Sequence, residues 1–218
     1  MTDPISKFND EVFALKVAAT QEAYDYFEEN IHPFERDEKG QIKVHNNDVD
    51  AFRHAYVSGV MTQKYGSFRA NILGQLNELK GDIVRDQPKE EKNMDLWNNA
   101  VGRKYGEQTK SRKKLAELIK EALNKGALII TTNQSEDSRK YSEVEQYIDR
   151  EKPVVVLKES KTGRNEVFLD LIRSSVMSRE GFVAKISRGV YPGYTVASID
   201  GLKTPMSNPD GVASNNLG

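Results

Sequence analysis

The residues best suited to chemistry lie in three polar stretches, where a simple core helix would carry leucine. The first stretch, HNNDVDAFRHAYVSG, contains Asp50, Arg53 and His54. Residues four apart share one face of a helix, so Asp50 and His54 should be neighbours. Such an aspartate either stabilises the helix as half of a charge pair or orients the imidazole for acid–base catalysis. Spacing alone leaves both interpretations open.

The second and third stretches, GQLNELKG and NMDLWNNAVGRKYG, add more polar groups at helical spacing. Glu78 ends the second, near a helix C-terminus where a negative charge is disfavoured unless a positive group meets it. In the third, Asp95, Asn98, Asn99 and Gly102 form one regular seam. Asparagines are poor helix formers that compete for the backbone. A hydrogen-bonded interior network is the simplest explanation for them, and an ordinary exposed face is the alternative.

Several amphipathic helices must position these side chains. Apolar spacing and capping residues predict helices over 5–30, 46–65, 67–79, 88–105 and 111–124. The small residues Ala55 and Gly59 would let a neighbouring helix come close to the second of them.

After Gly126 the pattern changes. Short apolar, β-branched runs at 127–132 and 153–159 favour strands, with a helix between them, and residues 165–178 resemble a last helix. From Gly181 onward, alternation predicts a hairpin or irregular strands around the turn at 191–193, and the final turn-rich tail should be mobile unless it docks. We therefore predict a mainly α protein: a helical bundle core of about five helices in a domain 1–126 that carries the polar site, and a smaller α+β or irregular segment at 127–218.

Composition limits the classes of function. The chain has 218 residues, 30% of them charged, with a net charge of -1, which argues against broad attraction to nucleic acid or anionic membranes. The absence of cysteine excludes disulfides, zinc–thiolate sites and cysteine nucleophiles. No signal peptide, no membrane-spanning apolar run, no P-loop and no dinucleotide fingerprint is visible. We expect a protein synthesised as a soluble cytoplasmic chain, without nucleic acid as its partner.

Taken together, NNDVDAFRHAYVSG, GQLNE and NMDLWNNAVGR resemble a bacterial and phage domain family of unknown function. Members of that family also occur at the ends of polymorphic-toxin-like proteins. Its pattern is an Asp-Ala-Phe-Arg-His-Ala segment, an Asp-Ala-His-Glu segment and a Met-Asp-Leu-His-Asn-Asn segment ending in Gly-Arg. The resemblance covers residues 45–106. This chain departs from the pattern at Gln75, Asn77 and Trp97, so one histidine of three is left.

The resemblance implies a set of site residues. The positions expected to be catalytic are His54, Glu78, Asp50 and Asp95. Those expected to bind substrate are Arg53, Asn98, Asn99 and Arg103. No metal ligand is assigned and no cofactor is predicted. Loss of two imidazoles disfavours zinc, while a divalent cation on carboxylates, such as Mg²⁺ or Ca²⁺, stays an open alternative.

Two functions are compatible with these residues. One is an effector or toxin-like hydrolase acting on a small-molecule or envelope substrate, with His54 or Glu78 as base and a guanidinium or amide stabilising an anion. The other is a non-catalytic phage or bacterial structural protein that binds a protein partner and is delivered or virion-associated. In that case Arg53 and Arg103 neutralise the acids in a buried, paired network.

Overall fold

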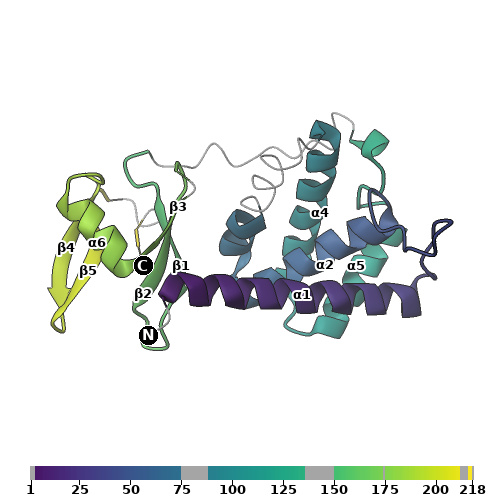
Figure 1. The fold of residues 1–218 in the computed structure, drawn as a ribbon, viewed down its shortest axis with the longest axis horizontal. Helices are drawn as coiled ribbons and strands as arrows, with labels where there is room; N and C mark the ends of the chain where they lie inside the picture. The colour runs from purple at the N-terminus through teal and green to yellow at the C-terminus, as the bar shows by residue number, and fades with distance from the viewer. Residues whose placement is uncertain (1–2, 75–87, 136–149, 174, 212–215, 218) are drawn as a thin grey trace. The chain divides into compact units, whose positions relative to one another are not determined.

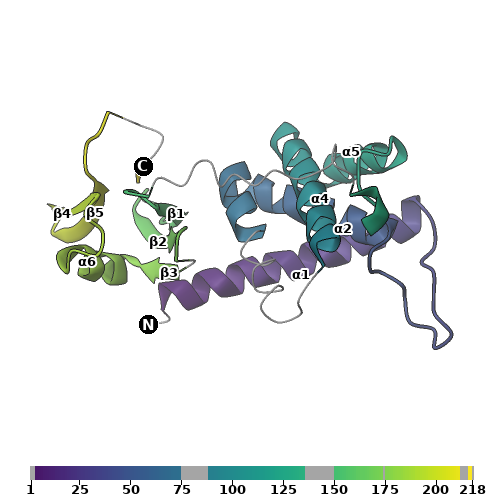
Figure 2. The same ribbon diagram turned by 90° about the horizontal axis from the view of Figure 1, so that it is seen from above.

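The protein forms two compact units, which we describe separately. The computed structural model describes residues 3–74, 88–135, 150–173, 175–211 and 216–217 (Figures 1 and 2). Residues 13–142 make up one unit, called here the helical unit, and residues 1–12 with 143–218 make up the other, called the C-terminal unit. The predicted fold class, mainly α with a smaller α+β part, is confirmed.

The helical unit contains the predicted amphipathic helices. Their bounds are α1 Pro4–Asn30, whose first residues belong to the C-terminal unit, α2 Asp48–Tyr65, α4 Lys89–Gln108 and α5 Arg112–Asn124. Residues 67–74 are also helical, and the predicted continuation to 79 lies outside the described residues. The side chain of Asn47 caps α2 by accepting a bond from the Asp50 amide, and Ser111 caps α5 through the Lys114 amide.

Aromatic side chains from α1 and α2 form the centre of the helical core. The Phe27 and Phe52 rings are fully buried and meet edge to face, with centroids 5.7 Å apart. Small and branched residues from α2, α4 and α5 complete this core, among them Ala55, Val60, Met94, Leu115 and Ile119. Burial of this apolar surface provides the main driving force that holds the helices together.

Helices α2 and α4 cross at very short range because glycine lies at the crossing. A Cβ atom at Gly102 would lie 1.9 Å from the carbonyl oxygen of Ala55, a distance no side chain can adopt. A Cβ atom added at Gly59 on α2 would also be too close, 2.9 Å from the Gly102 carbonyl oxygen. The crossing brings the polar side chains of the two helices within contact distance of each other.

The prediction of a strand at 127–132 is wrong. Leu128 and Ile129 are buried, but the chain there is irregular and continues into a short 3-10 turn, η1 Thr132–Gln134. The backbone groups that a strand would pair with a neighbour are bound by a side chain instead. Asn98 Oδ1 accepts from the Ile129 amide at 2.9 Å, and Asn98 Nδ2 donates to the Ile129 carbonyl at 2.8 Å.

The C-terminal unit consists of a three-stranded antiparallel sheet, a helix and a hairpin. The bounds are β1 Val154–Glu159, β2 Asn165–Asp170, β3 Ser175–Ser178, α6 Arg179–Ser187, β4 Tyr194–Ile199 and β5 Leu202–Ser207. The sheet order is β1-β2-β3, and β4 pairs with β5 (Figure 1). The strand predicted at 153–159 is therefore confirmed as β1.

The prediction of a last helix at 165–178 is wrong, because this stretch contains the antiparallel strands β2 and β3. The Asp170 carboxylate explains the turn, since it accepts bonds from the amides of Ile172 and Arg173 and from the Arg173 guanidinium. An aspartate that captures following amides stabilises a turn in preference to a continuing helix.

The hairpin expected from Gly181 is only partly correct. Residues up to Ser187 form α6, which Ser178 caps, while the true hairpin, β4–β5, turns at Asp200 and Gly201 and not at 191–193. The tail docks at Leu217, whose amide donates to Ser207 Oγ and whose carbonyl accepts from Asn165. The helix expected between the two apolar runs lies outside the described residues.

Candidate functional site

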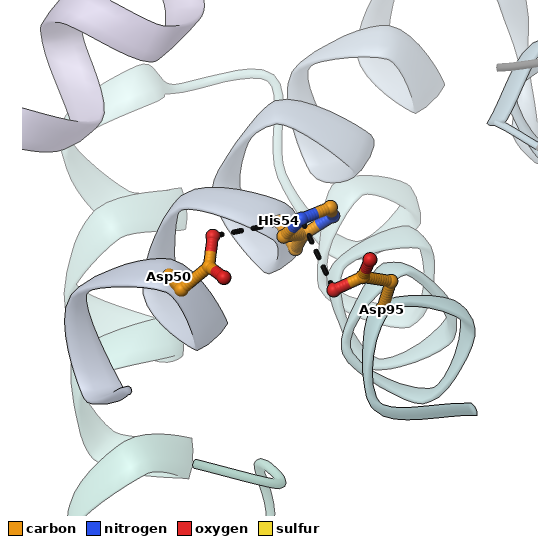
Figure 3. A group of neighbouring side chains, drawn as sticks. All are labelled: Asp50, His54 and Asp95. Carbon is orange, nitrogen blue, oxygen red and sulfur yellow. Dashed lines mark ion pairs between the residues drawn. The ribbon is translucent and has the colours of Figure 1, made fainter. Parts of the chain in front are cut away.

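The centre of the polar region is an Asp–His–Asp group on two helices. Asp50 and His54 lie one turn apart on α2, and Asp95 reaches them from α4 (Figure 3). His54 Nε2 is 3.2 Å from Asp95 Oδ1 and 3.6 Å from Asp50 Oδ1. Both carboxylates are buried, whereas 14% of the His54 side chain is exposed. The imidazole therefore lies between two buried acids and reaches the surface on one side.

Arg53 is the principal counter-ion of this group. Its Nη2 donates to Asp50 Oδ1 in a very short contact and lies 2.8 Å from His54 Nε2. The second oxygen of Asp50 accepts from the Asn46 amide at 2.9 Å. A guanidinium can only donate, so in this contact the imidazole nitrogen accepts, and the proton on Nε2 that would bind Asp95 is absent. His54 Nε2 thus has two competing partners, Arg53 and Asp95.

Burial and neighbouring charges decide the protonation of the site. Desolvation, together with the cations of Arg53 and Lys16, lowers the pKa of His54 to about 3 against the opposing effects of Asp50 and Asn99. Burial alone would raise the pKa of Asp50, but attraction to His54 and Arg53 and the bonds from Arg53 and Asn46 bring it below its usual value. At neutral pH the group contains a neutral imidazole and an ionised Asp50.

A pocket of about 220 Å³ opens beside His54. It is small compared with the roughly 300–1,000 Å³ of pockets for drug-sized ligands. Its lining combines cations and hydroxyls with short apolar residues: Lys16, Thr20, Arg53, His54, Val57, Ser58, Met61, Ala70, Gly74 and Asn99. Among the residues that the structure describes, this lining contains two basic side chains and no carboxylate. The pocket is therefore suited to a compact anionic group.

The remaining predicted site residues are only partly brought together. Asn99 interacts with His54 and lines the pocket. Asn98 is fully buried and binds the Ile129 backbone, and Arg103 is buried on the same helix. Glu78 lies outside the described residues.

Sequence reasoning missed Lys16 and Thr20 on α1. They follow the ordinary surface pattern of an amphipathic helix, so no local signal marks them. Only the packing of α1 places these two residues at the pocket.

The same group offers ligand atoms to a metal ion. One atom each from Asp50, His54 and Asp95 lies within 4.8 Å of the others, which suits three protein ligands plus water around a divalent cation. The Arg53 guanidinium already contacts two of these three residues. A cation at this place would have to displace it, so Arg53 and a metal ion are competitors.

Fold and site together define a mainly helical domain with a buried Asp–His–Asp group beside a small pocket. The comparisons with known proteins place this chain in a family. A family model described as "Domain of unknown function (DUF6973)" matches residues 9–127, and the chain belongs to that family. No solved structure matches the fold. Within the described part of the chain, no helix has the length and apolar character required to cross a membrane.

Proposed function

We propose that the helical unit is a hydrolase domain in which His54 is the general base and Asp95 orients it. The single observation that carries this proposal is the position of His54, which lies 3.2 Å from a buried carboxylate and also lines the pocket. Hydrolases place an imidazole in this way, with the acid behind it and the substrate in front.

The chemistry follows from the two partners of Nε2. When Arg53 turns to an anionic substrate, Nε2 can carry the proton and donate a hydrogen bond to Asp95, which leaves Nδ1 as the basic nitrogen. Nδ1 then takes a proton from water as the hydroxide adds to a carbonyl carbon or a phosphorus atom. The imidazolium later returns this proton to the leaving group, so the imidazole is regenerated.

The charges around the pocket favour a substrate with an anionic group. A histidine with a pKa of about 3 is neutral at pH 7 but is a weak base. Two of the causes of this low pKa are the cations Arg53 and Lys16, both of which line the pocket. An anion bound between them would offset their charge and raise the pKa of His54 toward the working range. Binding of substrate would therefore activate the base.

The hydrolase would act as an effector if its substrate belongs to a competitor or host. The resemblance of residues 45–106 to domains at the ends of toxin-like proteins supports this part of the proposal. A phosphate ester of a cell envelope would match the positive charge of the pocket.

The test is hydrolysis by the full chain with three chromogenic esters: p-nitrophenyl phosphate, bis-p-nitrophenyl phosphate and the neutral p-nitrophenyl acetate. Turnover of a phosphate ester should fall about 100-fold or more in His54→Gln and in Asp95→Asn, the range for loss of a general base. His32→Gln is the matched control, because His32 pairs with Asp48 and not with the site. Glu78→Gln tests the remaining predicted residue. Equal turnover by wild type and a folded His54→Gln protein would refute the proposal.

A second candidate function is structural, and one specific observation favours it. The carboxylates of Asp50 and Asp95 are buried, Asp50 pairs with the partly buried Arg53, and Arg103 is buried on the same helix as Asp95. Four charges that balance in this way resemble a paired network, which a non-catalytic phage or bacterial protein could retain for stability. Arg53→Met should then cost about 3–5 kcal/mol in the free energy of unfolding, and the wild-type chain should hydrolyse none of the three esters.

A further inference from the structure

The C-terminal unit contains a second cavity, independent of His54. Its volume is about 470 Å³, within the roughly 300–1,000 Å³ that binds small organic molecules. Its walls come from the turn before β2, the first residue of α6, the β4–β5 hairpin and the docked tail. The lining residues that carry the argument are Arg164, Asn165, Arg179, Ile199, Met206 and Leu217.

The charge of this cavity is positive. Two guanidinium groups line it, and the described part of its lining contains no aspartate or glutamate. Arg179 Nε donates to the Asn165 carbonyl at 2.8 Å, and no carboxylate among the described residues pairs with Arg179. Arg164 pairs with Asp200, whose side chain is 74% exposed, and such surface pairs contribute little and exchange partners readily. Both guanidinium groups can therefore serve a ligand.

The walls of the cavity are held in place by a chain of hydrogen bonds. Asn165 Nδ2 donates to the Leu217 carbonyl at 2.6 Å, and the Leu217 amide donates to Ser207 Oγ at 3.1 Å. The Leu217 side chain is buried in the core of this unit. Arg179 is fixed through Asn165 to the same chain of contacts. A site arranged before binding loses less entropy when it takes a ligand.

The cavity also has an apolar side. Ile199 and Met206 line it, although 45% and 42% of their respective surfaces remain exposed. Exposed apolar side chains next to paired cations suit a ligand with an apolar body and an anionic head. Stacking of nucleic-acid bases would need exposed aromatic rings. The tyrosines of this region, Tyr191 and Tyr194, are buried in the core instead.

We propose that this cavity binds a small organic anion, with its carboxylate or phosphate on Arg179 and Arg164 and its apolar body on Ile199 and Met206. Planar guanidinium groups bind both kinds of anion through two parallel hydrogen bonds. A carboxylate and a phosphate share this chemistry, and titration with hexanoate and with hexyl phosphate distinguishes them.

The test is isothermal titration of the full-length chain with hexanoate and hexyl phosphate. Hexanol lacks the charge and inorganic phosphate lacks the apolar body, so both should bind at least tenfold more weakly than the better of the two anions. Arg179→Gln should weaken binding at least tenfold, and Arg179→Lys should weaken it less because the charge is kept. Arg188→Gln is the matched control, since Arg188 is the residue that follows α6 and lies outside this cavity.

Substitution of Arg179 also removes its bond to the Asn165 carbonyl, so a second variant that keeps this bond is needed. Met206→Glu places a negative charge at the exposed side of the cavity and should also weaken anion binding at least tenfold, with an unchanged circular dichroism spectrum. Hexanol that binds as tightly as hexanoate, or both variants binding normally, would overturn the proposal. Tighter binding of a single-stranded thymidine oligonucleotide than of hexyl phosphate would overturn the assignment to a small molecule.

Discussion

The low pKa of His54 predicts that acid destabilises the helical unit through this one residue. In the unfolded chain the imidazole has a pKa near 6.5, and in the folded chain its pKa is about 3. The unfolded state therefore binds more protons between these two values, so the free energy of unfolding falls as the pH falls from about 6.5 to about 3. Above pH 6.5 the imidazole is neutral in both states and this loss is absent.

The size of the effect follows from the difference in pKa. Each pH unit below 6.5 costs about 1.4 kcal/mol until the folded pKa is reached, so wild type should lose about 3 kcal/mol at pH 4.5 through His54 alone. His54→Gln replaces the imidazole by an amide that does not titrate, so this loss should disappear from the variant. The pKa of His32 is raised, first by its bond with the Pro33 carbonyl and then by Asp48. A raised histidine pKa stabilises the folded state as the pH falls, and this contribution is the same in wild type and His54→Gln.

The assay is urea denaturation at several pH values from 7.5 to 4, followed by the fluorescence of Trp97. Trp97 is the single tryptophan of the chain and belongs to α4, so it reports on the helical unit. The comparison uses the slope of stability against pH, which removes any constant difference between the two proteins. His32→Gln is the control, because His32 pairs with Asp48 and not with the site, so this variant should keep the loss of stability that His54 causes. Parallel slopes for wild type and His54→Gln would refute the reasoning.

Three further predictions concern the packing and the site. Gly102→Ala should destabilise the helical unit by about 1–3 kcal/mol in urea denaturation, because its Cβ would overlap the Ala55 carbonyl. At the helical control Gly74→Ala the added Cβ would lie 3.8 Å from Asn99 Nδ2, an ordinary van der Waals contact, so this variant should be neutral or slightly stabilising. Asn98→Ala should cost about 2–4 kcal/mol, since both buried polar groups of Ile129 lose their partner, while the exposed Asn124→Ala should change stability by less than about 0.5 kcal/mol. Arg53→Met should raise the affinity for Zn²⁺ or Mn²⁺ at least tenfold in equilibrium dialysis, because it removes the competitor of a metal ion at Asp50, His54 and Asp95. An unchanged affinity would show that Arg53 does not compete with a metal ion there.

The helices of the helical unit could be read from the sequence because their signals are local. Apolar residues recur at steps of three and four, and capping residues mark the ends. The helix predicted over 46–65 is found as α2 Asp48–Tyr65, with the same last residue and a start two residues later. Helix formation depends on groups within one turn of each other, so a short window of sequence contains the relevant information.

The errors fell where contacts distant in sequence decide the conformation. Residues 127–132 have the composition of a strand, but Asn98, about thirty positions earlier, binds the backbone of Ile129 in place of a neighbouring strand. Residues 165–178 have the apolar spacing of a helix, yet each half pairs with the other, and the Asp170 turn joins them. Strand pairing depends on a partner that a local pattern does not identify.

For the candidate site, the sequence by itself determined that Asp50 and His54 share a face of α2 and that α4 carries a polar seam with Asp95. Only the tertiary structure decided that these two faces meet, that Arg53 contacts both Asp50 and His54, and that Lys16 and Thr20 from α1 complete a pocket. The physical reason is the crossing of α2 and α4 at Gly59 and Gly102, where the absence of side chains allows backbone contact. Helical periodicity fixes which residues lie on a face, and packing fixes what that face contacts.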